Sequence, residues 1–270
     1  MSEKQQTVLK TNSQIPFDSI SEYDSDQDYL KLIRKISAGI IEGGDNENQI
    51  HNINDLRRLR KYHLELFTAT FSNLLPSFIA NLMKSSKVEV CFNALTLVSE
   101  IFSFYCENVI NNWIPDLLPI IVQSSTSKFG LLSKQSFHAL INLANNMYYQ
   151  ETLDTLLEII LENDEVTSDN ACETLLLFFS TISENVLLNS FLWYDACEYI
   201  YKMLQSGNNT TKENAKIIMY HLEIKFNIDY PFFLSFFEND DQRKFVNECM
   251  NGYQNDKIFT NLEIFLKQNS

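Results

Sequence analysis

The side chains that could bind a metal ion or attack a substrate are few and far apart in this sequence. The four histidines are scattered, and no two cysteines are closer than Cys91 and Cys106. The complete set of cysteines is Cys91, Cys106, Cys172, Cys197 and Cys249. A structural zinc site needs clustered Cys and His ligands. We therefore expect no metal site, and we interpret the cysteines as reduced core residues of a cytoplasmic protein.

Residue patterns typical of catalysis are also missing. His138 and His221 each lie inside an apolar helical pattern, where packing is the ordinary role of a histidine. The pair Gly43-Gly44 has no following Lys-Ser or Lys-Thr, so it predicts the end of a helix and not a phosphate-binding loop. The acidic pairs Asp164-Glu165 and Asp240-Asp241 are expected at helix ends, where carboxylates interact with the helix dipole. The sequence predicts no enzyme and no cofactor.

Composition favours helices and argues against two classes of partner. Hydrophobic residues make up 45% of the 270 residues, enough for a core, while 6 Gly and 5 Pro are too few for a many-stranded sheet protein. The net charge of -14 repels phosphate backbones and anionic membranes, so we expect no nucleic-acid partner. No segment offers about 18 uncharged apolar residues, so we expect no membrane insertion.

The chain divides into a polar tail and one folded domain. Residues 1–25 have few large apolar side chains and are predicted to be disordered. Residues 26–270 are predicted to form the domain, with a first helix over residues 26–42 and a loop over residues 45–54. An amphipathic segment that includes Ile258, Leu262 and Leu266 is expected to cap its C-terminal end.

A repeated phrase sets the period of the domain. Leu74-Leu75-Pro76 recurs as Leu117-Leu118-Pro119, 43 residues later, and a weaker echo begins at Leu156. This spacing is typical of HEAT units of about 40–47 residues, each built from two helices. Helical patterns between the phrases cover residues 88–104, 133–144, 170–182 and 213–226. We predict an all-α fold, an α-solenoid of about six HEAT-like helix pairs.

From about Asp26 to Asn251, the order of these motifs resembles a TOG domain of the CLASP family, the HEAT-repeat regulators of microtubules. The opening helix before Gly43-Gly44, the two Leu-Leu-Pro phrases, and Lys212-Glu213-Asn214-Ala215-Lys216 carry the resemblance. Its closing helices resemble the stretch from Phe226 to Lys244. The resemblance implies a flat paddle whose intra-pair turns form one edge, and this edge would contact αβ-tubulin or a microtubule.

The resemblance also implies which residues would bind. The edge residues in chain order are Tyr29, Lys84, Lys87, Lys128, Phe129, Lys212 and Lys216. A row of cations attracts an acidic partner, and an aromatic side chain buries apolar area at the contact. Two features depart from the family: residues 163–167 carry acids in the fourth turn, and Tyr29 stands where a Trp is usual. Both weaken the expected affinity for tubulin.

Two other interpretations of the same residues stay open. The lysines are also what any solvated helix end carries. In a second interpretation, the chain is a HEAT or armadillo-type adaptor that has lost tubulin binding and takes another protein or peptide, for which its acidic surface favours a basic ligand. The expected location is cytoplasmic, and the resemblance points to the cytoskeleton.

Overall fold

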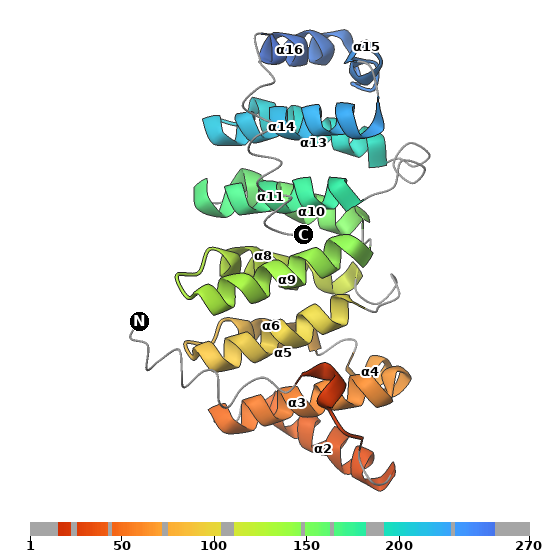
Figure 1. Ribbon diagram of the computed structural model, residues 1–270, viewed down its shortest axis with the longest axis vertical. Coiled ribbons are helices and arrows are strands. Elements are labelled where there is room, and N and C mark those ends of the chain that lie inside the picture. The colour runs from red at the N-terminus through yellow and green to blue at the C-terminus, as the bar shows by residue number, and fades with distance from the viewer. Residues whose placement is uncertain are drawn as a thin grey trace. The chain divides into compact units, whose positions relative to one another are not determined.

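The computed structural model describes most of the chain, in two compact units. The described residues are 16–22, 26–42, 45–71, 75–103, 111–146, 149–162, 165–181, 192–227 and 230–251. Unit 1 comprises Met1–Thr155 and unit 2 comprises Leu156–Ser270. Within the described ranges, every regular element is a helix, which confirms the predicted all-α class (Figure 1).

Unit 1 is a stack of helix pairs. Its α-helices are α2 (Asp26–Glu42), α3 (Asn46–Tyr62), α4 (Leu64–Phe71), α5 (Leu75–Met83), α6 (Val88–Phe102), α8 (Ile114–Ser125) and α9 (Gly130–Asn146). Its two 3-10 helices are η1 (Phe17–Ser19) and η2 (Asn111–Trp113), and α10 (Tyr149–Glu162) crosses the boundary between the units. Helix α2 packs on α3, α5 on α6, and α8 on α9. The pairs then stack through α3 with α6, α6 with α9, and α5 with α8.

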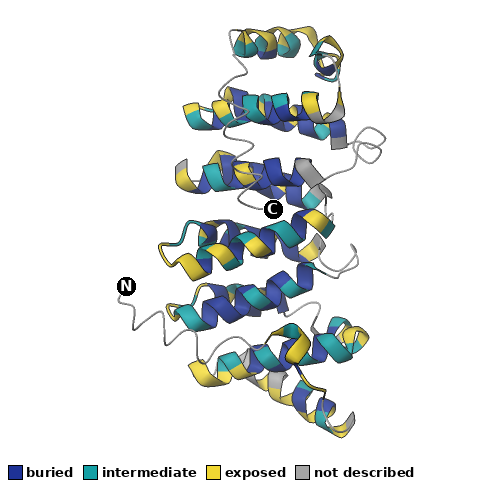
Figure 2. Ribbon diagram, viewed as in Figure 1, coloured by how far each residue is buried: buried dark blue, intermediate teal, exposed yellow. Residues whose placement is uncertain are grey.

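Helix α6 shows why the pairs must stack. Its buried side chains include Val90, Leu95, Val98 and Ile101, which lie on more than one face of the helix. Because α6 contacts α3, α5 and α9, nearly its whole circumference is covered (Figure 2). A helix that is apolar on most faces cannot stay in water alone, so the neighbouring pairs stabilise it.

Unit 2 contains α11 (Glu165–Thr181), α13 (Leu192–Gln205), α14 (Asn209–Phe226), α15 (Tyr230–Leu234) and α16 (Asp240–Met250). Helix α14 packs on α11 and α13, and α13 and α15 both contact α16. Asparagine side chains mark the helix ends. Asn208 and Asn239 cap the starts of α14 and α16, and Asn227 ends α14 in the left-handed conformation at φ 49°. The Asn208 and Asn239 side chains each accept a backbone N–H of the first helical turn, and the Asn227 backbone N–H donates to carbonyl oxygens of the last turn of α14.

Residues 16–22 correct the predicted tail, because they are folded against α3. The Lys61 ammonium donates hydrogen bonds to the carbonyl oxygens of Phe17, Asp18 and Ile20, at 2.9–3.0 Å. Ile20 is buried, and the Arg60 guanidinium lies over the Phe17 ring at 4.9 Å. The polar composition of this segment predicted disorder wrongly. One isoleucine and one phenylalanine are enough to hold it on α3, because its backbone carbonyl groups supply most of the contacts.

Several other sequence predictions can be compared with the helices. The predicted first helix over residues 26–42 is confirmed as α2. The predicted loop over residues 45–54 is wrong, because α3 begins at Asn46, with the Asp45 carboxylate accepting from the Asn48 backbone N–H at 2.9 Å. Residues 1–15, Cys106 and the predicted C-terminal cap lie outside the described residues.

Candidate protein-binding surfaces

Polar contacts between successive helix pairs set the register of unit 1. The buried Arg57 guanidinium on α3 binds both oxygens of Glu100 on α6, at 2.5–3.0 Å. Asn142 on α9 donates to the carbonyl and hydroxyl oxygens of Ser99 on α6, at 3.1 and 2.9 Å. Each contact joins residues 43 positions apart, the spacing of the Leu-Leu-Pro phrases. Neighbouring pairs therefore repeat in register, and the turn between α5 and α6 lies along the same edge as the turn between α8 and α9 (Figure 1).

The turn between α5 and α6 presents two lysines on this edge. The Ser85 hydroxyl accepts the Lys87 backbone N–H at 3.2 Å, and the Lys87 carbonyl accepts the first helical bond, from Cys91. Lys84 and Lys87 are both exposed. The hydrogen bond between the Ser85 hydroxyl and the Lys87 backbone closes the turn without using either lysine side chain. Both lysine side chains are therefore available at the surface.

The turn between α8 and α9 repeats the same design. The Ser127 hydroxyl accepts the Phe129 backbone N–H at 3.2 Å, and the Phe129 carbonyl accepts from Leu132 and Ser133 as α9 begins. Lys128 is exposed, and Phe129 exposes 42% of its surface, which is unusual for a phenylalanine. We call Lys84, Lys87, Lys128 and Phe129 the unit-1 turn edge.

Tyr29 does not belong to such an edge, which corrects the prediction. It lies inside α2, is only 3% exposed, and packs edge-on against the His63 ring with ring centroids 3.7 Å apart. A side chain this buried cannot reach a partner without unfolding the first helix pair. Tyr29 is a packing residue of unit 1.

Lys212 and Lys216 are also misplaced by the sequence prediction, because they lie within α14 and not in a turn. The turn before α14 has the same serine contact as the two turns of unit 1: the Ser206 hydroxyl accepts the Asn208 backbone N–H at 3.1 Å. Asn208 therefore occupies the position of Lys87 and Phe129. Lys216 is mostly covered and pairs with Glu213 at 2.7 Å. The serine three residues before the start of each helix is the signal that identifies the turns correctly.

The predicted acidic fourth turn, residues 163–167, is largely helical. Helix α11 begins at Glu165, Val166 is 60% exposed, and Thr167 is buried. Residues 163 and 164 lie outside the described residues. The described part of this segment therefore belongs to the first turn of α11.

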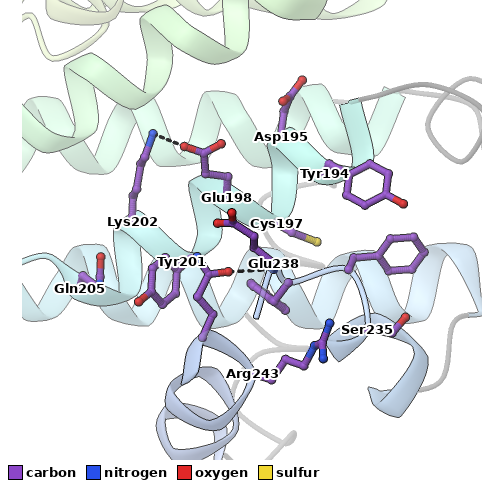
Figure 3. A pocket seen from close by; sticks show the side chains of 13 residues that line it. Tyr194, Asp195, Cys197, Glu198, Tyr201, Lys202, Gln205, Ser235, Glu238 and Arg243 are labelled. Atoms are coloured by element: carbon purple, nitrogen blue, oxygen red, sulfur yellow. Dashed lines mark hydrogen bonds and ion pairs between the residues drawn. The ribbon is translucent and has the colours of Figure 1, made fainter. Parts of the chain in front are cut away.

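A groove in unit 2 is a second candidate surface, which the sequence patterns did not reveal. Its volume is about 550 Å³, and it lies between α13 and the segment that joins α15 to α16. Its lining includes Tyr194, Glu198, Tyr201, Phe236 and Glu238 (Figure 3). We call it the unit-2 groove. Tyr194, Glu198 and Tyr201 share one face of α13 by their spacing of three or four residues, and that spacing is the signal in the sequence.

Ion pairs fix the cations of this groove. Lys202 pairs with Glu198 at 2.5 Å, and Arg243 pairs with Asp240 at 2.8 Å, both within one helix. Cys197 lines the groove but is buried as a residue, and burial raises the pKa of its thiol, so the thiolate is disfavoured. The groove offers aromatic faces and carboxylates, and no reactive thiolate.

Buried thiols and one Ser–His contact were the residues most able to suggest catalysis. Burial raises the pKa of Cys91 to about 11 and that of Cys172 to about 12. The Ser99 hydroxyl lies 2.9 Å from His138 Nδ1, but Ser99 is only 2% exposed. Asn142 donates to the same hydroxyl at 2.9 Å, so this group of three side chains joins α6 to α9. In the described part of the chain, no group of three or more His, Cys, Asp or Glu side chains could hold a metal ion, and no helix is long and apolar enough to cross a bilayer.

Comparisons with known proteins find distant structural likenesses only. No family model and no curated protein matches the sequence. An engineered protein solved by the Northeast Structural Genomics Consortium is similar at a TM-score of 0.42 and 14% identity, over 83% of this chain and 98% of that chain. A designed armadillo repeat protein in complex with the peptide (KR)4 is similar at a TM-score of 0.39 and 13% identity, over 89% of this chain and 98% of that chain.

A third likeness is to computationally designed armadillo repeat proteins for modular peptide recognition. Its TM-score is 0.40 at 15% identity, over 83% of this chain and 99% of that chain. Likenesses this distant carry no information about function. The helical-repeat character of unit 1 rests on its own contacts, namely the 43-residue register and the stacking of α3, α6 and α9.

Proposed function

We propose that this chain is a non-catalytic protein-binding module that engages an acidic protein surface through the unit-1 turn edge. One observation carries the proposal: two successive turns of the same design place Lys84, Lys87, Lys128 and an exposed Phe129 along one edge. On a chain of net charge -14, three exposed cations and one exposed ring on two successive turns form a distinct surface. Cations speed the encounter with an acidic partner, and the ring supplies apolar area in the complex.

Within this proposal, αβ-tubulin is the specific partner that the resemblance to CLASP-family TOG domains suggests. Two of the predicted contacts lie inside helices instead of turns, and Tyr29 is buried. Tubulin binding would therefore depend on the edge of unit 1. The contact would weaken steeply with salt, since exposed charges are screened beyond about 8 Å at physiological ionic strength.

The test is gel filtration and co-sedimentation of the full chain with purified tubulin, at low and at moderate salt. We expect K84E/K87E/K128E to reduce affinity at least tenfold, because each charge reversal turns attraction into repulsion. The matched control is K31E/K35E/K244E, which reverses three other exposed lysines and changes the net charge equally. Equal binding by both variants would contradict the edge proposal, and absence of wild-type binding would contradict the tubulin assignment.

The second candidate is an adaptor that binds another protein or peptide after losing tubulin affinity. The reduction of the predicted row of contacts to two turns favours it, as does the pairing of Lys216 with Glu213. The same variants distinguish it: an adaptor that uses the edge retains a partner other than tubulin, and K84E/K87E/K128E releases that partner while the control does not. We also propose a cytoplasmic location, which the free thiols of Cys91, Cys172, Cys197 and Cys249 support.

A further inference from the structure

The surface around the unit-2 groove exposes large aromatic side chains. Tyr194 is 58% exposed and Phe232 is 54% exposed. Phe236 lies between them, with its ring centroid 5.7 Å from Tyr194 and 5.0 Å from Phe232, both edge to face. Contiguous exposed rings with a polar rim are typical of binding surfaces.

A buried tryptophan lies beneath this aromatic cluster. Trp193 is 1% exposed and contacts both Phe233 and Phe236, each at 5.3 Å between ring centroids. Phe236 packs on the buried Trp193, and Tyr194 and Phe232 pack on Phe236. These side chains would therefore lose little conformational entropy on binding. At the opposite side of the groove, Tyr201 is fixed against Phe245 at 5.6 Å.

Carboxylates line the same groove as these rings. In Figure 3, Glu198 and Glu238 are seen between Tyr194 and Tyr201, and all four line the same groove. Gln242 accepts the backbone N–H of Glu238 at 2.8 Å, which holds the loop that carries this carboxylate. Lys202 pairs with Glu198, and Arg243 pairs with Asp240, which lies outside the lining. Because Asp195 and Glu238 also line the groove, its lining carries more carboxylates than cations.

We propose that the unit-2 groove binds an arginine side chain, followed by an apolar residue, on an extended segment of a partner protein. A guanidinium is planar, so it stacks on a tyrosine face while its N–H groups donate to carboxylates on either side. The adjoining apolar residue would pack on Tyr194, Phe232 and Phe236. A lysine ammonium is more strongly hydrated and cannot stack, so the groove discriminates between the two cations.

The observations favour this ligand by charge complementarity as well as by shape. Three carboxylates and two cations line the groove, an excess of one negative charge in a protein of net charge -14, so the groove favours a basic segment over an acidic one. The unit-1 turn edge carries the opposite charge and belongs to a different unit, so the two proposals stand or fall separately.

The experiment measures fluorescence anisotropy of a labelled Gly-Gly-Arg-Phe-Arg-Gly peptide with the full chain at about 150 mM salt. We expect saturable binding by the wild-type chain, at least about tenfold weaker for E198Q/E238Q, and several-fold weaker for the same peptide with lysine in place of arginine. E47Q/E65Q removes two exposed carboxylates of unit 1 and should leave the affinity unchanged within about twofold.

Y194A is a second variant, which leaves every charge in place, and it should also lower the affinity for the arginine peptide. K84E/K87E/K128E should bind the peptide as the wild type does, which separates this result from the test of the turn edge. Circular dichroism verifies that each variant is folded. Equal affinity of E198Q/E238Q and E47Q/E65Q, or no preference for arginine over lysine, would overturn the proposal, as would the absence of saturable binding.

Discussion

Unit 1 and unit 2 join their helices with different side chains, and the difference explains their different surfaces. In unit 1, charged and amide groups join successive pairs, as Arg57 does with Glu100 and Asn142 with Ser99. In unit 2, rings join α13 to the α15–α16 segment, with Trp193 against Phe233 and Phe236. Directional bonds fix register and so align the turns into an edge. Aromatic packing fixes less direction and leaves rings exposed around a groove.

The largest effect expected from this comparison is that of W193A in unit 2. Removing a fully buried indole leaves a cavity beneath the exposed rings, and we expect a loss of about 4 kcal/mol in the free energy of unfolding. Hydrogen exchange should increase first in α15 and in the residues that follow it, because Phe233 and Phe236 pack on Trp193. Y194A removes an exposed ring of the same helix and should cost less than about 1 kcal/mol. Equal protection of α15 in W193A and the wild type would show that the Trp193 contacts do not join this helix to α13.

R57A tests the polar counterpart in unit 1. Arg57 is 2% exposed and Glu100 keeps only 13% of its side-chain surface in water, so the variant leaves a carboxylate without its guanidinium. We expect a loss of about 3 kcal/mol in urea unfolding, and R57K should recover only part of it because an ammonium lacks the planar fork. R34A, an exposed arginine of α2, is the control. If R57A were as stable as R34A, the register of the pairs would not depend on this ion pair.

The smallest effect sharpens the comparison between units through one matched pair of amides. Asn142 makes two hydrogen bonds to Ser99 in unit 1, while Asn214 makes one to Asp169 in unit 2, at 3.2 Å. We expect N142A to lose about 1.5 kcal/mol and N214A about 0.5 kcal/mol, in proportion to the bonds removed. Thermal unfolding of both, with exposed N145A as reference, measures the order. The reverse order would show that unit 2 also depends on directional contacts.

The sequence predicted the helices better than the surfaces, for a physical reason. Apolar spacing reports which side of a helix is buried, so α2 was predicted to the residue, and the Leu-Leu-Pro phrases gave the 43-residue repeat that Arg57 and Glu100 show. The polar composition of residues 45–54 hid the start of α3, because Asp45 caps a helix whose first turns are exposed. Amide-rich first turns look like loops when hydrophobicity alone is considered.

The edge residues show the limit of a linear pattern more clearly. Lys84, Lys87, Lys128 and Phe129 were predicted correctly to lie in turns, because both turns follow a clear break between apolar segments. Tyr29 was misplaced because a tyrosine on an N-terminal helix can face either a partner or its own neighbour, and His63, 34 positions later, decides which. The unit-2 groove depends on Phe236 meeting Tyr194 across the fold, a contact that no local spacing encodes.

The segment that lies on α3 at residues 16–22 has a consequence for how this stretch tolerates sequence change. Three side chains of α3 donate hydrogen bonds to its main-chain oxygens, which every amino acid possesses, namely those of Arg58, Lys61 and Tyr62. Substitution at Asp18, Ser19 or Ser21 would therefore leave the attachment intact, whereas Phe17, Ile20 and Glu22 contribute through their side chains, the Glu22 carboxylate lying 4.0 Å from His63 Nε2. The sequence of such a segment can therefore change at most positions between related proteins while the segment still packs on the same helix.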